Sequence, residues 1–157
     1  MSLFSRIKWL TLVAFLLVLP GCGEPLPDGF PKLYPVSIQF IQEGEPVAEA
    51  SVILMPQDDG KWAVGGATDA NGIATFRTHG KHSGVPAGKY KVMIQKQDIV
   101  QKPTNIPGEF LYDSFDLIDP NFRSENTPLE IEVISGRNKF DPIDLGKSVR
   151  IQVPRIN

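Results

Sequence analysis

Two histidines are the first residues of this chain whose type and spacing could support chemistry. His79 and His82 stand in the stretch Thr-His-Gly-Lys-His-Ser-Gly, and the chain contains no other histidine. A His-x-x-His pair can bind a metal ion when a third ligand is fixed nearby, and Asp69 is a candidate for that ligand. Nothing in the sequence fixes Asp69 beside the pair, and Gly80 leaves the intervening backbone flexible. We therefore interpret both as solvated loop histidines and expect no bound metal and no cofactor.

Several oxygen-bearing residues also need to be tested against known chemistry. Asp58-Asp59 and the sequence Asp-Ala-Asn-Gly at 69–72 offer oxygen ligands to calcium, but the twelve-residue calcium loop with its closing glutamate is missing. Turns stabilised by Asp and Asn side chains explain both stretches better. Ser83 lacks the Gly-x-Ser-x-Gly surroundings of a nucleophile elbow, and no glycine-rich phosphate loop is present. The sequence predicts no catalytic residues, and we expect that the chain is not an enzyme.

One segment combines aromatic rings with carboxylates. Tyr112, Asp113, Phe115 and Asp116 follow one another closely within residues 96–126. Rings that stack and carboxylates that accept hydrogen bonds can together bind a sugar. The alternative is a lid whose aromatic rings pack on the domain while its acids face water, and we favour it. The four residues are retained as a possible ligand surface.

The single cysteine has a different role, which its position suggests. Residues 1–22 carry two basic residues, Arg6 and Lys8, before an apolar run at 9–19 and end at Cys22, which is the layout of a secretory signal. That run is about half the roughly 20 residues needed to span a bilayer. Leu19-Pro20-Gly21-Cys22 resembles the bacterial lipobox, with Pro20 where a smaller residue is usual. The resemblance implies cleavage before Cys22, lipidation of Cys22 and attachment to a membrane by acyl chains.

Composition and charge limit the partners that this chain can have. The chain has 18 acidic and 16 basic residues, and its signal removes two of the basic ones and none of the acidic ones. The exported part is thus mildly acidic, which gives no electrostatic reason to expect nucleic acid. It also has no second cysteine, so the core must stabilise the fold without disulfides. We expect a lipid-anchored protein of the bacterial cell envelope, at the outer membrane and facing the periplasm or the surface.

The elements behind the anchor are predicted to be short strands. Residues 23–34 form a proline-rich tether, and residues 35–154 form one domain. Polar and apolar residues alternate in the segments 35–41, 73–77, 88–95, 129–133 and 149–153. Residues 50–55 are apolar on both faces, which predicts a central strand covered on both sides. Residues 96–126 lose the alternation, which predicts an irregular excursion holding a short helix or an irregular strand near 110–117. We predict an all-β fold, an antiparallel sandwich of seven to eight strands.

Three short patterns then point to a family. They are Gly-x-Pro-Val-x-x-Ala at 44–50, Thr-Asp-x-x-Gly at 68–72 and Pro-x-Gly-x-Tyr at 86–90. The region 36–153 resembles the carboxypeptidase regulatory-like, or transthyretin-like, domain, and the whole chain looks like small planctomycete lipoproteins of that type. The resemblance implies a transthyretin-like or Ig-like Greek-key sandwich that acts as an accessory or interaction module, and it carries over no catalytic residue.

Three functions remain open at this point, and the third, least favoured one is an enzyme or metal protein that uses His79 and His82. The first is a membrane-anchored, non-enzymatic lipoprotein whose β-sandwich is an interaction or structural module of the envelope, with an envelope protein as its partner. The second is a carbohydrate-binding module that uses the segment 110–117 to bind a glycan. The first two have the membrane as a partner through the lipid of Cys22, and neither involves nucleic acid.

Overall fold

The computed structural model describes residues 28–58 and 60–154. Cys22, the predicted signal and residues 23–27 of the predicted tether lie outside these residues, so the predictions about them stay predictions. The chain divides into two compact units, Met1–Phe30 and Pro31–Asn157, and the description below concerns the second. Within the described part of the chain, no helix has the length and apolar character needed to cross a membrane.

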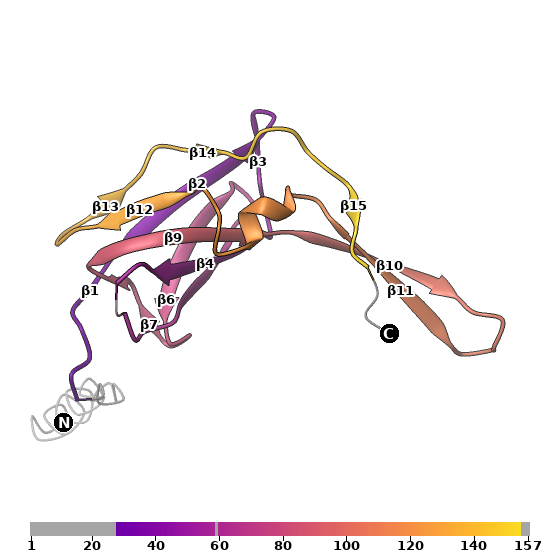
Figure 1. Ribbon diagram of the computed structural model, residues 1–157, viewed down its shortest axis with the longest axis horizontal. Coiled ribbons are helices and arrows are strands. Elements are labelled where there is room, and N and C mark those ends of the chain that lie inside the picture. The colour runs from indigo at the N-terminus through magenta and orange to yellow at the C-terminus, as the bar shows by residue number, and fades with distance from the viewer. Residues whose placement is uncertain (1–27, 59, 155–157) are drawn as a thin grey trace, which may run out of the picture. The chain divides into compact units, whose positions relative to one another are not determined.

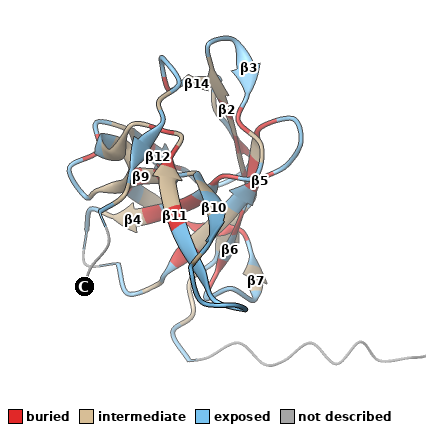
Figure 2. Ribbon diagram, turned by 90° about the vertical axis from the view of Figure 1, so that its right-hand side faces the viewer, coloured by how far each residue is buried: buried red, intermediate tan, exposed pale blue. Residues whose placement is uncertain are grey.

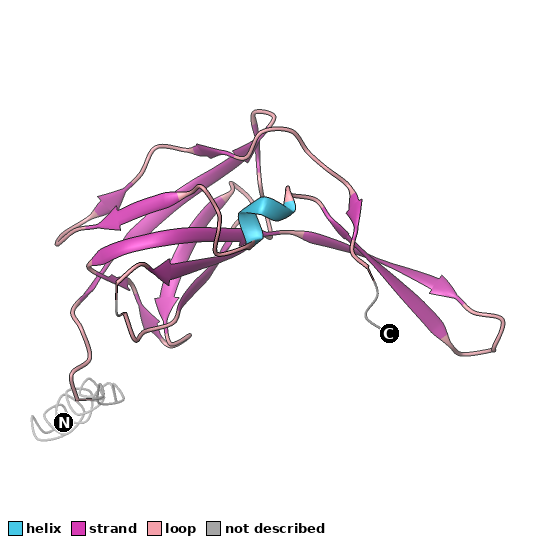
Figure 3. Cartoon of the chain, in the orientation of Figure 1, coloured by secondary structure: helices cyan, strands magenta, loops and turns pink. Residues whose placement is uncertain are grey.

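The described residues are almost entirely strand and loop (Figure 3). The main sheet has the strand order β12-β9-β4-β5-β6-β2-β13, and a smaller sheet has the order β10-β11-β15. Most pairs are antiparallel, whereas β13 and β14 run parallel to β2. The predicted all-β class is confirmed. The strands are β1 (Leu33–Tyr34), β2 (Val36–Gln42), β3 (Glu45–Pro46), β4 (Ser51–Pro56), β5 (Val64–Thr68), β6 (Ile73–Thr78), β7 (His82–Ser83), β8 (Val85–Pro86), β9 (Gly88–Gln95), β10 (Gln97–Pro103), β11 (Phe110–Asp116), β12 (Glu130–Val133), β13 (Asn138–Lys139), β14 (Ile143–Asp144) and β15 (Ile151–Gln152).

The core consists of side chains from one face of the main sheet, where every second residue of a strand points inward. In β9, Tyr90, Val92 and Ile94 are buried, and the residues between them point outward. Strand β2 buries every second residue in the same way. Each large aliphatic side chain removed from water contributes about 1.5–3 kcal/mol. The inward side chains of β12 and of β2 belong to one cluster. The chain turns after β12 into β13, which pairs with β2 (Figure 1).

Strand β4 is central, as predicted, but it is covered on one face only. It pairs with β5 on one side and β9 on the other. Val52 and Leu54 are buried, while Ser51 and Ile53 on the opposite face are exposed. The prediction that β4 is covered on both faces was wrong, because no layer of the described residues covers the face that carries Ile53.

The turn between β5 and β6 follows its sequence pattern. The Asp69 carboxylate accepts hydrogen bonds from the backbone N–H groups of Asn71 and Ile73, each at 2.9 Å. Gly72 has a φ of +72°, and a Cβ there would lie 2.5 Å from the carbonyl oxygen of Phe40. Only glycine combines that backbone angle with this close approach. The Asp-x-Asn-Gly stretch is therefore a turn that fixes the β5–β6 hairpin.

Residues 96–126 are more regular than their sequence suggested. Strands β10 and β11 form a long antiparallel hairpin with seven paired positions, from Gln97↔Asp116 to Pro103↔Phe110. A single turn of 3-10 helix, η2 (Pro120–Arg123), follows. An irregular excursion packed by Phe110 and Tyr112 was a wrong prediction, because both side chains are about half exposed, at 49% and 57%.

Both ends of the predicted domain also differ from expectation. Leu33 and Tyr34, the last residues of the predicted tether, form β1 and pair with β8, and Tyr34 packs against the core. At the other end the predicted strand 149–153 shortens to β15. It joins β11 rather than the core sheet, and Ile151 is 44% exposed. The alternation at 149–153 indicated a strand but could not indicate which sheet it joins.

Candidate functional site

The β10–β11 hairpin extends away from the core sheet and is the most prominent feature of the domain (Figure 1). Its base is fixed by a backbone hydrogen bond of 2.9 Å from Leu117 to Lys96. The Gln42 side chain donates from β2 to the carbonyl oxygens of Leu117 at 3.4 Å and Lys147 at 3.2 Å. Beyond that base the two strands are mostly exposed (Figure 2).

One face of the hairpin carries large apolar side chains without a covering layer. Because residues opposite each other on antiparallel strands point to the same side, the register places Ile99, Phe110 and Tyr112 on one face. Their exposed fractions are 63%, 49% and 57%. Ile151 of β15 is opposite Asp116 and joins the same face. We call these four residues, Ile99, Phe110, Tyr112 and Ile151, the contact face.

The other face of the hairpin carries charge. The Lys102 ammonium lies 2.5 Å from the Asp113 carboxylate, which is buried. Arg150 lies 2.7 Å from Asp98, and its guanidinium stacks over the Phe115 ring at 4.2 Å from the centroid. Arg150 thus covers the Phe115 ring on this face, whereas Leu111, which lies opposite Lys102, is 46% exposed.

Asp116 points to the same side as Tyr112 but is held at the hairpin base. Arg123 from η2 donates to one carboxylate oxygen at 2.6 Å, and the Gln97 amide donates to the other at 2.9 Å. The side chain of Asp116 is 4% exposed. A buried carboxylate with both oxygens bound to protein groups has a structural role here, since it joins η2 to the hairpin.

The structure thus separates the four residues predicted as a possible ligand surface. Tyr112 is available to a partner, whereas Phe115 lies under Arg150 and both carboxylates are buried in ion pairs. Sequence reasoning missed Ile99 and Ile151 as exposed apolar residues, because a strand pattern does not reveal which face lacks a core.

A depression lies beside β9 and is lined by Trp62, Tyr90, Lys89, Asp58 and Pro86. The Tyr90 hydroxyl donates to the carbonyl oxygen of Pro86 at 2.9 Å. Burial, together with the nearby negative charge of Asp58, raises the pKa of Tyr90 above its ordinary value. The folded domain therefore favours the neutral, protonated side chain of Tyr90.

The histidine segment has a packing role in this structure. The ring of His79 lies 4.9 Å from that of Trp62, and His79 has a φ of +52°. His82 belongs to β7, which pairs with β6. Among the described residues, no group of three or more His, Cys, Asp or Glu side chains is arranged to hold a metal ion.

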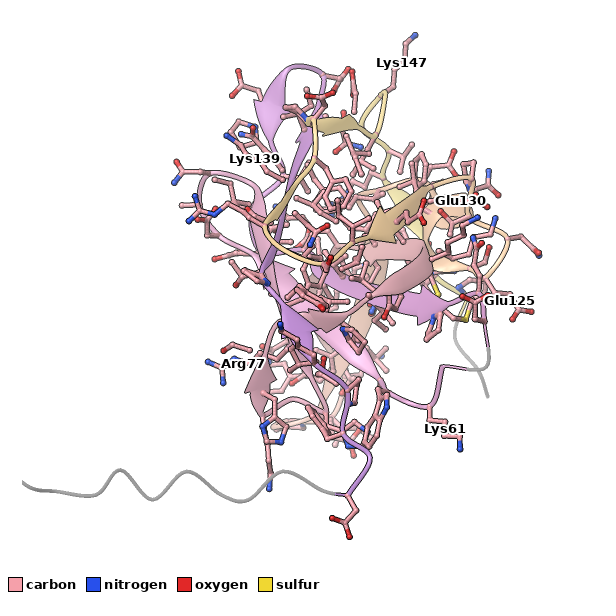
Figure 4. All side chains as sticks on the ribbon, turned by 90° about the vertical axis from the view of Figure 1, so that its left-hand side faces the viewer. Lys61, Arg77, Glu125, Glu130, Lys139 and Lys147 are labelled. Atoms are coloured by element: carbon pink, nitrogen blue, oxygen red, sulfur yellow. The ribbon has the colours of Figure 1, made fainter. Side chains whose placement is uncertain are left out.

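Charged side chains among the described residues lie on several elements of the domain (Figure 4). Lys61, Arg77 and Lys147 point outward from different parts of the domain (Figure 4). On β12 and β9, the exposed Glu130 and the partly buried Lys91 form an ion pair at 2.7 Å. The Lys91 ammonium, which bonds to and attracts the carboxylate, lowers the pKa of Glu130. The apolar contact face, rather than a charged one, is the feature that distinguishes this surface.

Comparison with known proteins adds no family. Neither the models of known protein families nor the curated proteins give a match to this chain. Among solved structures, a 9R-lipoxygenase from Cyanothece PCC8801 is similar over 91% of this chain, with 14% sequence identity and a TM-score of 0.35. The chain spans 20% of the length of that lipoxygenase.

Proposed function

We propose that this chain is a lipid-anchored, non-enzymatic protein of the bacterial cell envelope, and that its β-domain binds another envelope protein through the contact face. The observation that carries the proposal is the position of Ile99, Phe110, Tyr112 and Ile151 on a hairpin outside the core. Grouped exposed apolar side chains mark interaction sites more often than scattered ones do. Aromatic residues such as Tyr112 supply much of the energy of protein interfaces.

The way the hairpin is built supports this role. Its charged face is internally neutralised by Lys102 with Asp113 and Arg150 with Asp98. Its base is braced by Asp116 and Arg123. These contacts hold the two strands in one conformation without burying the contact face. A pre-ordered surface loses less conformational entropy on binding than a flexible loop does.

The finer fold is part of the same proposal. We propose a sandwich of the transthyretin-like type, supported by the places where the three sequence patterns fall. The first precedes β4, the second forms the β5–β6 turn at Gly72, and the third enters β9 at Tyr90. The lipidation of Cys22 and an outer-membrane location, facing the periplasm or the surface, rest on the sequence pattern at 1–22.

A photo-crosslinking amino acid tests the contact face. The full-length chain carries it in place of Tyr112 and is irradiated in intact cells. We expect one discrete adduct with an envelope protein. The matched control places it at Ile53, which is 48% exposed on β4, away from the hairpin. Equal adducts from both positions, or none from position 112, would remove the support for this surface.

A carbohydrate-binding role is the second candidate, and the exposed ring of Tyr112 is the observation that favours it. It is weaker because Asp113 and Asp116, which would bind sugar hydroxyls, are engaged in ion pairs. Binding of the full-length chain to a glycan array, lost on Tyr112→Ala and retained on Ile53→Ala, would favour it over the protein partner.

A further inference from the structure

Strand β10 has a free edge. It is the outer strand of the sheet β10-β11-β15. Lys96 accepts a backbone hydrogen bond from Leu117, and Thr104 donates one to Glu109. In an antiparallel ladder, bonded residues alternate, so the even-numbered residues of β10 bond to β11. The backbone groups of Gln97, Ile99 and Gln101 therefore point away from β11, and no described residue pairs with them.

We propose that this edge pairs with the β10 edge of a second copy of the chain. Two identical strands can meet antiparallel about a two-fold axis, and each outward N–H group then faces a carbonyl of the other copy. The pairing would join the two three-stranded sheets through β10. This pairing uses the backbone edge of β10. It does not require a partner to be bound at the contact face.

The charges of β10 select one register. With Val100 opposite Val100 of the second copy, Asp98 of each copy lies opposite Lys102 of the other. These are non-hydrogen-bonded pairs, whose side chains are closest in an antiparallel ladder. Ile99 and Gln101 then exchange backbone hydrogen bonds. A shift that places Ile99 opposite itself would instead bring Lys96 against Lys102, which is unfavourable.

The charged groups inside each copy extend this complementarity. Arg150 already binds Asp98, and Lys102 already binds Asp113. In the paired arrangement, the Lys102 ammonium of the second copy lies next to Asp98. Charges then alternate along the row Arg150, Asp98, Lys102 and Asp113 across the junction. Such a network is worth more than an isolated exposed pair.

Features that normally protect a sheet edge do not block this one. Lysine and proline are common edge-protecting residues. Pro103 stands at the end of β10 and still offers its carbonyl oxygen to Gln97 of the second copy. Lys102 is neutralised by Asp113 within its own copy. The central residues Ile99 and Gln101 have ordinary N–H and C=O groups.

A disulfide reports this register directly. In the full-length chain, Val100→Cys places two cysteines across the two-fold axis, where Cα atoms are about 4.5 Å apart, within the range that a disulfide spans. We expect a disulfide-linked dimer in the oxidising envelope. Gln101→Cys is the matched control, since position 101 lies opposite position 99 of the other copy. The unsubstituted chain shows how much cross-linking occurs through Cys22 alone.

Val100→Lys tests the same pairing without a cross-link. Inside one copy the introduced ammonium group lies opposite the carboxylate of Asp113, so the hairpin keeps its fold, and circular dichroism should be unchanged. Between copies the two introduced ammonium groups face each other, which should raise the dissociation constant about tenfold or more in detergent, measured by light scattering. Val100→Thr should leave it near the starting value. A monomeric unsubstituted chain, or equal cross-linking through positions 100 and 101, would overturn the proposal.

Discussion

At the scale of single residues, buried polar groups in this domain find partners inside it. Thr68 is 5% exposed, and its hydroxyl oxygen accepts the backbone N–H of Ala50 at 2.8 Å. Thr78 donates to the carbonyl oxygen of Gly84 at 2.8 Å. Asn138 binds the backbone of Ile134 through both ends of its amide. Such side chains replace strand pairing where turns interrupt the sheet.

Thr68→Val should therefore destabilise the domain. Valine has the same shape and suits a strand, but it leaves the buried N–H of Ala50 without its acceptor. We expect a loss of about 1–3 kcal/mol of unfolding free energy, the cost of an unsatisfied buried donor. Urea denaturation measures it. Thr75→Val on β6 is the control, because Thr75 is exposed, and its effect should stay within about 0.5 kcal/mol. Equal effects would contradict the role of the Thr68 hydroxyl.

Tyr90 gives the domain a pH dependence in the alkaline range. Its folded-state pKa is raised above the ordinary value of 10.0, mainly by burial. The unfolded state therefore loses the phenol proton first. The resulting stability is fully present below about pH 10 and is lost as pH rises from there through the folded-state pKa.

Tyr90→Phe separates this effect from packing. The ring stays, but the hydrogen bond to Pro86 is lost, which should cost about 1 kcal/mol at pH 7. Above about pH 10 the variant should lose less stability than the unsubstituted chain does. Urea denaturation at about pH 7 and about pH 10.5 compares the two slopes. Parallel pH profiles would show that Tyr90 does not carry the dependence.

At the scale of elements, the sequence pattern predicts the strands that pack against the core. It does not predict the strands of the hairpin, which pack against no core. The alternation at 88–95 predicted the buried residues of β9 because burial and strand period coincide there. In β10 and β11 the face that carries Lys102 and Arg150 is held by ion pairs rather than by apolar packing. Such pairs leave no hydrophobic period in the sequence, so the hairpin resembled an irregular segment.

The candidate site was predictable only in part for a related reason. Tyr112 could be named from the sequence as an aromatic residue in this segment, but the burial of Asp116 depends on Arg123 from η2 and on Gln97 from β10. Contacts between elements far apart in sequence do not appear in local patterns. The same holds for the placement of Ile151, which depends on β15 pairing with β11.

The Arg123–Asp116 pair is predicted to hold the hairpin base. Arg123→Ala leaves a carboxylate that is 4% exposed with Gln97 as its remaining side-chain partner. Breaking a buried pair from one side costs up to about 3–5 kcal/mol, and the partial exposure of Arg123 reduces this to about 1–3 kcal/mol. We expect faster amide hydrogen exchange in β11 and little change in β4.

The exposed pair Arg150–Asp98 provides the control for that prediction. Both partners are about half exposed, at 52% and 42%, so Arg150→Ala should cost less than about 1 kcal/mol. It should also leave exchange near Asp116 unchanged. If Arg150→Ala loosened the base of β11 as much as Arg123→Ala does, the assignment of Arg123 as the main brace would be wrong.

At the scale of the whole molecule, stability and binding use different surfaces. The core cluster belongs to the main sheet, whereas the contact face and the free edge belong to the hairpin. Pairing through β10 would place both contact faces on the same side of the joined sheet, because opposite residues share a side. Two linked contact faces would bind a repeated or dimeric partner more tightly than one face does.

The proposed anchor belongs to this scale too, and a lipid label tests it. Cys22→Ser removes the thiol that would carry the acyl chains, so incorporation of an alkyne-bearing fatty acid should disappear. The precursor should accumulate with its signal still attached. Cys22 lies in the unit Met1–Phe30, whereas the core residues lie in Pro31–Asn157. The urea midpoint of the domain should therefore remain the same. Gly23→Ser keeps the cysteine and should keep the label. A labelled Cys22→Ser chain would place the lipid elsewhere and refute the anchor.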